Sequence, residues 1–229
     1  MRTQMLTVSP SHFQNAPASP ALAPGHVHLW RLDLDAPVPD DGASLDTAEW
    51  VRARRFHFER DRRRFIAGRS LLRRILGLYL DLDPQEVPLT TGPHGKPELS
   101  GMLSSLRFNL SHSEGLMLLA LTHARDIGVD VEAIRDSLPF EMLAEHYFEP
   151  EDAWRVRTQP IDERPAIFFD VWTSTEARLK AAGIGLAHGP TAPCPERWSM
   201  LRLSPAAGYT AALAVEGGSF QLACWSWRH

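Results

Sequence analysis

The stretch LRFNLSHSEGLMLLALTHARDIGVDVE, residues 106–132, decides the fold. Its two apolar runs, residues 106–110 and 116–122, flank the polar residues SHSEG and predict a pair of strands around that bend. The run IGVDVE, residues 127–132, alternates apolar and polar side chains as a half-buried strand does. Three strands in quick succession therefore predict a sheet that carries polar side chains close to its turns.

Outside this stretch, strands and helices alternate along the chain. The run VHLWRLDL, residues 27–34, predicts a strand, and Asp46 or Thr47 is a candidate cap for a helix that begins near Glu49. A longer helix follows, with an apolar stripe of Phe65, Ile66, Leu72, Ile75, Leu76 and Tyr79. The pattern then predicts mostly helix over residues 140–182, broken near Pro150 and between Pro160 and Pro165, and strands at 201–203, 209–216 and 219–227.

The chain divides into a tail and two halves. Residues 1–24 are rich in Pro, Ala and Ser, which predicts a flexible N-terminal tail. An N-terminal half, residues 25–123, and a C-terminal half, residues 124–229, share the order strand, helices, strands. We therefore expect an α+β fold in which two similar halves meet at a cleft.

Composition excludes several classes of protein. With 44% hydrophobic and 23% charged residues, the chain resembles an ordinary globular protein. Its apolar runs are far shorter than the ~20 residues that span a bilayer, and its first 25 residues lack the apolar core of a signal peptide. Cys194 and Cys224 are isolated, which argues against a disulfide framework and against zinc. We expect a soluble, cytoplasmic protein without a membrane partner.

The charge distribution is uneven. Residues 51–80 hold ten Arg against Glu59 and Asp61, a local charge of +8, so the rest of the chain carries −12 within a net charge of −4. Such a block is typical of a solvated helix face, and it also attracts phosphate groups. Among 24 basic residues only Lys96 and Lys180 are Lys, which reflects either drift in an Arg-rich composition or two places that need a compact ammonium.

Two acidic motifs are candidates for chemistry. Asp130 and Glu132 lie two apart on a predicted strand and face the same side, where paired carboxylates require either solvent, as on an exposed strand edge, or a bridging cation such as Mg²⁺. Glu176 and Lys180 are four apart, a spacing common in surface helix pairs. The neighbouring Trp172, Ala177, Leu179 and Ala181 instead favour a helix packed against the core.

Two further segments could contact phosphate. Lys96 lies in the turn PHGKP, residues 93–97, which can present an ammonium to a phosphate and backbone groups to a base. The segment SHS, residues 111–113, offers hydroxyl groups and an imidazole. As a plain turn the first segment needs no function, and a lone histidine in a turn is more often structural. The common nucleotide loops GxxxxGK[ST] and GxGxxG are absent.

The joint order of four segments is more specific than any one of them. GKP (95–97), FNLSHS (108–113), IGVDVE (127–132) and WTSTEARLKAAGIGL (172–186) together resemble the 4'-phosphopantetheinyl transferase superfamily. The resemblance covers roughly residues 30–216 and is to the larger type, which serves surfactin-like peptide synthetases. It implies a pseudo-dimer of two similar α/β halves with the active site at their interface.

The resemblance also implies an activity and roles for residues. The phosphopantetheine arm of coenzyme A would pass to a serine of an apo acyl or peptidyl carrier protein, with 3',5'-ADP as the other product and Mg²⁺, or Mn²⁺ in its place, as cofactor. Asp130, Glu132 and Glu176 would hold the metal, and Glu176 and Lys180 would be catalytic. The residues expected to contact coenzyme A are Arg52, Arg54, Arg64, Gly95, Lys96, Pro97, Asn109, Ser111, His112, Asp130 and Lys180. Thr175 departs from the family pattern W-x-x-K-E-A, in which a lysine is usual.

The resemblance further suggests partners. An acidic carrier is expected to dock near residues 138–148 and the basic Arg155 and Arg157. The pseudo-dimer favours a monomer, and the −12 charge outside residues 51–80 argues against a nucleic-acid partner. Two alternatives remain open: a nucleic-acid-binding module built on the Arg-rich segment 51–74, and a Mg²⁺-dependent nucleotide phosphatase built on the acidic cluster.

Overall fold

The computed structural model describes residues 8–38, 42–92, 96–101, 105–184 and 197–227. Its helices are α1 (Thr47–Ala53), α2 (Glu59–Leu80), α3 (Phe140–Tyr147), α4 (Pro150–Thr158) and α5 (Arg164–Ala181), with 3₁₀ turns η1 (Pro10–His12) and η2 (Pro84–Glu86). Its strands are β1 (Gln14–Asn15), β2 (His26–Asp33), β3 (Leu89–Thr91), β4 (Pro97–Leu99), β5 (Leu106–Ser113), β6 (Leu116–His123), β7 (Ile127–Ala133), β8 (Trp198–Leu203), β9 (Tyr209–Glu216) and β10 (Gln221–Ser226). The three strands predicted between residues 106 and 132 are β5, β6 and β7.

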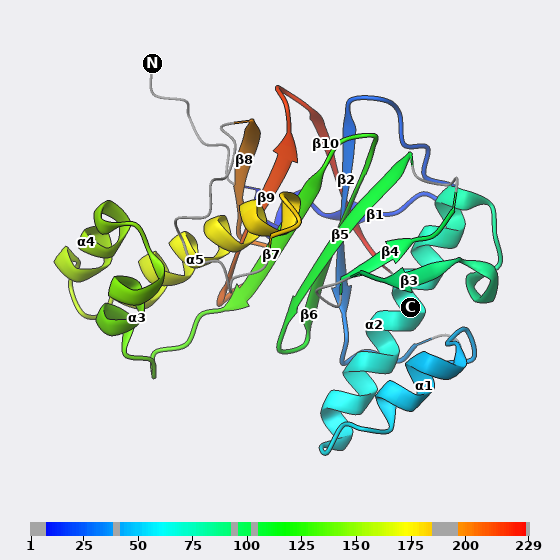
Figure 1. Cartoon of the computed structure of the whole chain (residues 1–229), viewed down its shortest axis with the longest axis horizontal. Helices are drawn as coiled ribbons and strands as arrows, with labels where there is room; N and C mark the ends of the chain where they lie inside the picture. Colours follow the sequence, from blue (N-terminus) through cyan, green and yellow to red (C-terminus); the bar gives the residue numbers. More distant parts are fainter. Residues whose placement is uncertain (1–7, 39–41, 93–95, 102–104, 185–196, 228–229) are drawn as a thin grey trace.

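Each half of the chain builds a sheet with the same strand order (Figure 1). The order is β2-β6-β5 in the first half and β7-β9-β8 in the second. In each set of three strands, the strand that comes last along the chain lies in the middle of the sheet, between the other two. All four pairings are antiparallel. A long helix, α2 or α5, lies between the first and second strands of each set. The shared order confirms an α+β fold of two similar halves.

The two halves share one hydrophobic core. Buried Val27 and Leu29 of β2 belong to the same cluster as Val129 and Val131 of β7. On the other face of the first sheet, α2 buries its apolar stripe in a second cluster, whose α2 members are Ala67, Leu71, Leu72, Ile75 and Leu76. Because the first cluster draws on both sheets, neither half buries its apolar surface by itself.

Helices α3 and α4 pack against the N-terminal part of α5, at the end of the molecule opposite α1 and α2 (Figure 1). Phe140 of α3 contacts Phe168 and Phe169 of α5, with ring centroids 5.3 and 6.1 Å apart. This aromatic cluster fixes the start of α5, the helix that carries Glu176 and Lys180. No helix in the described part of the chain is long and apolar enough to cross a membrane.

Strand β10 departs from the simple division at residue 123. It belongs to the C-terminal half in sequence, but it pairs in parallel with β2 and extends the sheet of the N-terminal half. A strand pattern does not specify its partner, because period-two alternation only defines which face is buried. The first sheet is therefore completed by the last strand of the chain.

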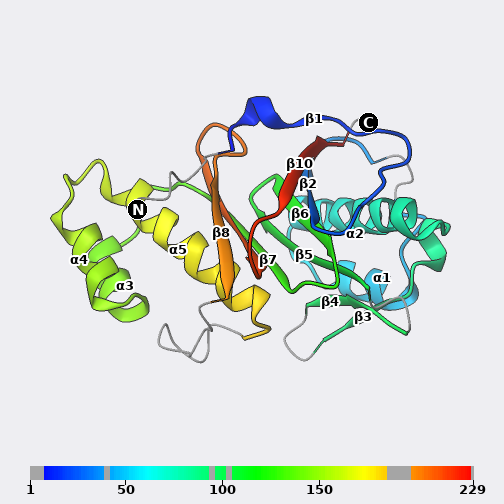
Figure 2. The same ribbon diagram turned by 90° about the horizontal axis from the view of Figure 1, so that it is seen from above.

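The N-terminal segment is also more ordered than a flexible tail over residues 8–24. Val8 is buried and bridges to Leu203 of β8, and β1 pairs in parallel with β10. Phe13 is buried under Arg31, whose guanidinium carbon lies 4.8 Å from the ring centroid. Figure 2 shows this segment passing from β8 to β10 across one end of both sheets. A few isolated apolar anchors suffice for this packing, and they leave no periodic signal in the sequence.

Part of the Arg-rich block has a structural role. Asp46 is the N-cap of α1, where its side chain accepts a hydrogen bond from the Glu49 amide (2.8 Å) and Glu49 accepts one from the Asp46 amide (3.0 Å). Arg73, only 2% exposed, donates to Glu49 (2.8 Å), to Asp46 (3.0 Å) and to the carbonyl of Val87 (3.0 Å). This buried network joins α1 to α2, so not every arginine of the block faces solvent or a ligand.

Candidate active site

The two sheets meet along β5 and β7 through side chains rather than through a backbone ladder. Three alternate residues of β5 face β7, as the two-residue period of a strand requires. Asn109 Oδ1 accepts a hydrogen bond from the Val129 amide (2.8 Å), Ser111 Oγ donates to Asp130 Oδ1 (2.7 Å), and Ser113 Oγ donates to Glu132 Oε2 (2.8 Å). The segments FNLSHS and IGVDVE are therefore two sides of one seam.

Lys180 of α5 reaches into this seam. Its Nζ donates to Asp130 Oδ1 (2.7 Å) and to Ser111 Oγ (3.0 Å). Asp130 is 3% exposed, and its other oxygen, Oδ2, is buried without a hydrogen-bond partner. A buried carboxylate oxygen without a partner is costly, and a cation or a donor from a ligand would satisfy it.

Small residues let α5 approach β7 closely enough for this contact. A side-chain carbon on Gly128 would clash with the Ala177 carbonyl oxygen and would lie 2.5 Å from the Ala181 amide nitrogen. Ala177 and Ala181 form a small cluster with Ala212 and Ala214 of β9. The glycine in IGVDVE is thus the position that permits helix and strand to pack in direct backbone contact.

Glu176 lies one helical turn before Lys180 and completes an acidic group. Burial raises its pKa to about 7; Lys180 opposes that rise, and the charges of Asp130 and Glu132 add to it. Burial is also the main cause of a raised pKa at Glu132, where the hydrogen bond from Ser113 acts in the opposite direction. Three neighbouring carboxyl groups against one ammonium leave an excess of negative charge that a divalent cation would neutralise.

The donor set fits a hard cation, although it is not preassembled. Carboxylate oxygens are the ligands that Mg²⁺ prefers, and the free Asp130 Oδ2 is available to it. Within the described residues, however, no three His, Cys, Asp or Glu side chains lie close enough together to form a ready-made metal site. Mg²⁺ usually keeps several waters and shares substrate phosphates, so such a site forms fully only with its ligand.

Lys96 approaches α5 from the first half. Lys96 Nζ donates to the carbonyl of Lys180 (3.3 Å) at the end of α5, and burial lowers its pKa. Pro97 is buried and begins β4. Gly95, the third residue predicted in this loop, lies outside the described residues. The two lysines of the chain, far apart in sequence, therefore meet at one end of α5.

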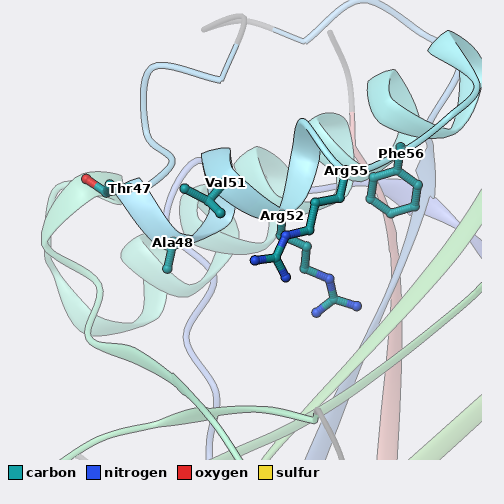
Figure 3. Close-up of a pocket in the computed structure, with 6 residues that line it drawn as sticks. All are labelled: Thr47, Ala48, Val51, Arg52, Arg55 and Phe56. Carbon is teal, nitrogen blue, oxygen red and sulfur yellow. The ribbon is translucent and has the colours of Figure 1, made fainter.

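His112 faces the opposite side of β5 from Ser111, because consecutive strand residues alternate. Its pKa is lowered first by burial and then by the charges of Lys180, Arg52, Arg64 and Arg69. Near these cations, α1 borders an open hollow of about 760 Å³, in which Arg52 and Arg55 extend from the same side of the helix (Figure 3). The hollow is lined by Thr47, Ala48, Val51, Arg52, Arg55 and Phe56.

Arg64 and Asn109, two further residues predicted to contact coenzyme A, make hydrogen bonds within the protein. Arg64 makes two hydrogen bonds to Asp35 (2.7 and 2.8 Å) and one to Glu114 (3.1 Å), which raises its pKa and ties α2 to the turn between β5 and β6. Asn109 is buried in the seam. Arg54 is the exposed C-cap of α1. Thr175, the departure from the family pattern, is half-buried on α5.

Sequence reasoning included Ser113 in the segment SHS without placing it against Glu132, and it gave Gly128 no role. The alternation of FNLSHS indicates that Ser113 shares a face with Ser111, and that signal was available. The close approach at Gly128 depends on where α5 packs.

Comparison with known proteins agrees with this geometry. A family model described as 4'-phosphopantetheinyl transferase, N-terminal, matches residues 41–124, and one described as the 4'-phosphopantetheinyl transferase superfamily matches residues 126–221. The chain belongs to the 4'-phosphopantetheinyl transferase superfamily. The two matches meet between β6, a strand of the first sheet, and β7, the first strand of the second.

Relatives in this superfamily carry the same enzyme name. The chain is 40% identical to the 4'-phosphopantetheinyl transferase HetI of Nostoc sp. PCC 7120 over 91% of this chain and 95% of HetI. It is 34% identical to a putative 4'-phosphopantetheinyl transferase of Synechocystis sp. PCC 6803 over 70% and 66% of the two chains, and 27% identical to Sfp of Bacillus subtilis over 59% of each. The predicted family and enzyme class are confirmed, and transfer of phosphopantetheine from coenzyme A to carrier proteins is the activity that this membership supports.

Proposed function

We propose that this phosphopantetheinyl transferase uses Mg²⁺ and moves the phosphopantetheine arm of coenzyme A to a serine of an apo carrier protein, releasing 3',5'-ADP. The observation that carries the proposal is the contact of Lys180, Asp130 and Ser111 at the seam between the halves, with Glu176 one turn away. Residues from three elements, β5, β7 and α5, converge there with an excess of carboxylates.

In the proposed reaction the serine Oγ of the carrier attacks the phosphorus that carries the phosphopantetheine arm, and the bond from that phosphorus to the bridging oxygen of 3',5'-ADP breaks. Such a displacement needs positioning and charge neutralisation more than a covalent enzyme intermediate. Mg²⁺, held by Asp130, Glu132 and Glu176, would polarise the pyrophosphate and offset its charge.

The side chains of the chain supply the remaining steps. Glu176 accepts the proton of the serine hydroxyl, directly or through a water, for which a pKa of about 7 is well suited. Lys180 stabilises the negative charge that develops on the leaving phosphate, because its ammonium is a compact point charge. Ser111 orients Lys180 and Asp130 through its hydroxyl group.

The carrier is proposed to dock near α3 and α4, and the structure changes the basis expected for that contact. Arg155 donates to Asp152 (2.7 Å), and Arg157 lies 4.0 Å from Glu145, so both predicted basic contacts already have acidic partners. Met142 and Trp154 are exposed there. Docking on this surface would therefore rest on apolar contacts more than on charge.

The test is to incubate the protein with coenzyme A, Mg²⁺ and a panel of apo carrier proteins and to weigh each carrier. A gain of one phosphopantetheine on the acceptor serine is expected, together with 3',5'-ADP. Phosphate release from nucleotides in the absence of a carrier would point to a phosphatase instead. Tight, salt-dependent nucleic-acid binding that survives Asp130→Ala and Glu176→Ala would point to the nucleic-acid module.

Glu176→Gln separates the chemistry from the fold. The amide keeps the shape of the side chain, but it cannot accept the proton or bind the metal as a charged carboxylate. Carrier modification should therefore fall by about 100-fold or more. Thermal unfolding of the variant should match that of the parent. Turnover at the parent rate would remove Glu176 from the reaction.

A further inference from the structure

Two serines of β5 hydrogen-bond the two carboxylates of β7 in the same way. Ser111 Oγ donates to Asp130 Oδ1 (2.7 Å), and Ser113 Oγ donates to Glu132 Oε2 (2.8 Å). Both serines lie on one side of β5 and both carboxylates lie on one side of β7, because strand side chains alternate. The pair of Ser113 and Glu132 therefore repeats, one step along the seam, the pair that the proposed reaction uses.

Each of the two carboxylates is engaged through one oxygen. Lys180 Nζ donates to Asp130 Oδ1 (2.7 Å), the oxygen that Ser111 also contacts, while Asp130 Oδ2 is buried without a hydrogen-bond partner. Within the described residues, the hydrogen bond from Ser113 and the ion pair with Arg135 (3.5 Å) both use Glu132 Oε2. Asp130 Oδ2 and Glu132 Oε1 are thus the oxygens left for a hard cation.

The hydroxyl group of Ser113 is itself held in place. Its Oγ accepts a hydrogen bond from the Ala133 amide (3.1 Å), so one lone pair is occupied and its single proton is directed to Glu132. A glutamate has one more rotatable bond than an aspartate, and fixing that bond on metal binding costs side-chain entropy. A hydrogen bond that already fixes the side chain reduces this cost.

We propose that Ser113 is a positioning residue, which holds Glu132 through Oε2 and so keeps Oε1 for the metal. The inference rests on the proposed function, because that function assigns Asp130, Glu132 and Glu176 to Mg²⁺. Ser113 binds neither the metal nor coenzyme A in this assignment and acts only through Glu132. Removal of a hydrogen-bond partner of a metal ligand typically lowers metal affinity or activity by about 10- to 100-fold.

Binding of Mn²⁺, followed by electron paramagnetic resonance with the same excess of coenzyme A in every sample, tests this assignment without turnover. Ser113→Ala should weaken Mn²⁺ binding by about 10-fold. Ser113→Thr keeps the hydroxyl group and should stay within about threefold of the parent. Ser199→Ala is the matched control, because Ser199 is also a strand serine but donates to the carbonyls of Gly217 (2.7 Å) and Gly218 (3.0 Å) rather than to a carboxylate.

The carrier assay separates positioning from a general structural role. In Ser113→Ala the Mg²⁺ concentration for half-maximal rate should rise by about 10-fold, while kcat at saturating Mg²⁺ should stay within about threefold of the parent. A loss of kcat that Mg²⁺ does not restore would indicate a structural role and would overturn the proposal. Parent-like Mn²⁺ affinity of Ser113→Ala, or equal losses in Ser113→Ala and Ser113→Thr, would also overturn it.

Asp130→Asn distinguishes this inference from the proposed function. If the parent binds no Mn²⁺ that this variant loses, the proposed metal site is wrong and the role of Ser113 is wrong with it. If Mn²⁺ binding depends on both Asp130 and Ser113 but no carrier is modified, the role of Ser113 is supported and only the proposed transfer is wrong.

Discussion

Lys180 is the residue whose proposed role depends most on the side chain being a lysine. Its ammonium lies within hydrogen-bond distance of Asp130 and Ser111, and its side chain is 29% exposed, so it reaches both the seam and any ligand above it. A guanidinium is larger, planar and less able to act as a point charge in that space.

Lys180→Arg is therefore the sharper test of this residue than Lys180→Ala. We expect Lys180→Arg to lower kcat for carrier modification by at least about 10-fold and Lys180→Ala by about 100-fold. Lys180→Arg should keep the melting temperature of the parent within a few degrees, whereas Lys180→Ala leaves the buried Asp130 carboxylate without its ammonium partner and should lower it. Near-normal activity of the Arg variant would mean that the scarcity of lysine in this chain is only compositional drift.

The proposed role of Glu176 as a base predicts that the reaction depends on pH. Its pKa is raised from 4.5 to about 7, so the group is protonated at pH 6 and ionised at pH 8, and only the ionised form accepts a proton. At a limiting Mg²⁺ concentration, where protons and Mg²⁺ compete for the Glu176 carboxylate, we expect kcat/KM to fall by about 10-fold per pH unit below 7 and to level off above it. The measurement is kcat/KM for coenzyme A between pH 5.5 and 8.5. A flat profile across that range would contradict the role of Glu176 as the base.

At the scale of elements, the packing of α5 on β7 sets the positions of Asp130, Glu176 and Lys180, the residues proposed to take part in the reaction. Gly128 lies against the backbone of α5 at Ala177 and Ala181, so there is no room for a methyl group between the helix and the strand. The same strand carries Asp130, and the same helix carries Glu176 and Lys180. A small displacement of α5 would therefore change both the fold and the site.

Gly128→Ala should lower the free energy of unfolding by about 1–3 kcal/mol or more, because the added carbon meets backbone atoms that cannot move aside. Activity should fall further than stability alone explains, since α5 would carry Lys180 away from Asp130. Gly218→Ala is the control: its added carbon meets nothing within 4 Å. Urea unfolding and the carrier assay on both variants would decide, and parent-like behaviour of Gly128→Ala would refute the close contact.

At the scale of the whole molecule, the two halves are similar in topology but not independent. They share the core between β2 and β7, and β10 of the second half pairs with β2 of the first. The proposed active site uses residues of both halves, so it would form only when the halves are together.

Separating the chain between β6 and β7, after Ala124, tests this dependence. We expect each half alone to lack a cooperative thermal transition, and the two halves produced together to associate and recover carrier-modifying activity. The readouts are near-ultraviolet circular dichroism, calorimetry and the carrier assay, with the intact chain as control. A cooperative transition in either half alone would show that the shared core is dispensable.

The sequence by itself determined the α+β class, the strands between residues 106 and 132, and the residues of the acidic group. Period-two and helical patterns reflect which faces are buried, and the order of four motifs was sufficient for the family. Only the tertiary structure decided that β10 completes the first sheet, that residues 8–24 pack across both sheets, and that Arg73 is buried. These features depend on contacts between residues far apart in the chain, and no local pattern encodes the partner of a strand edge or the neighbour of an arginine.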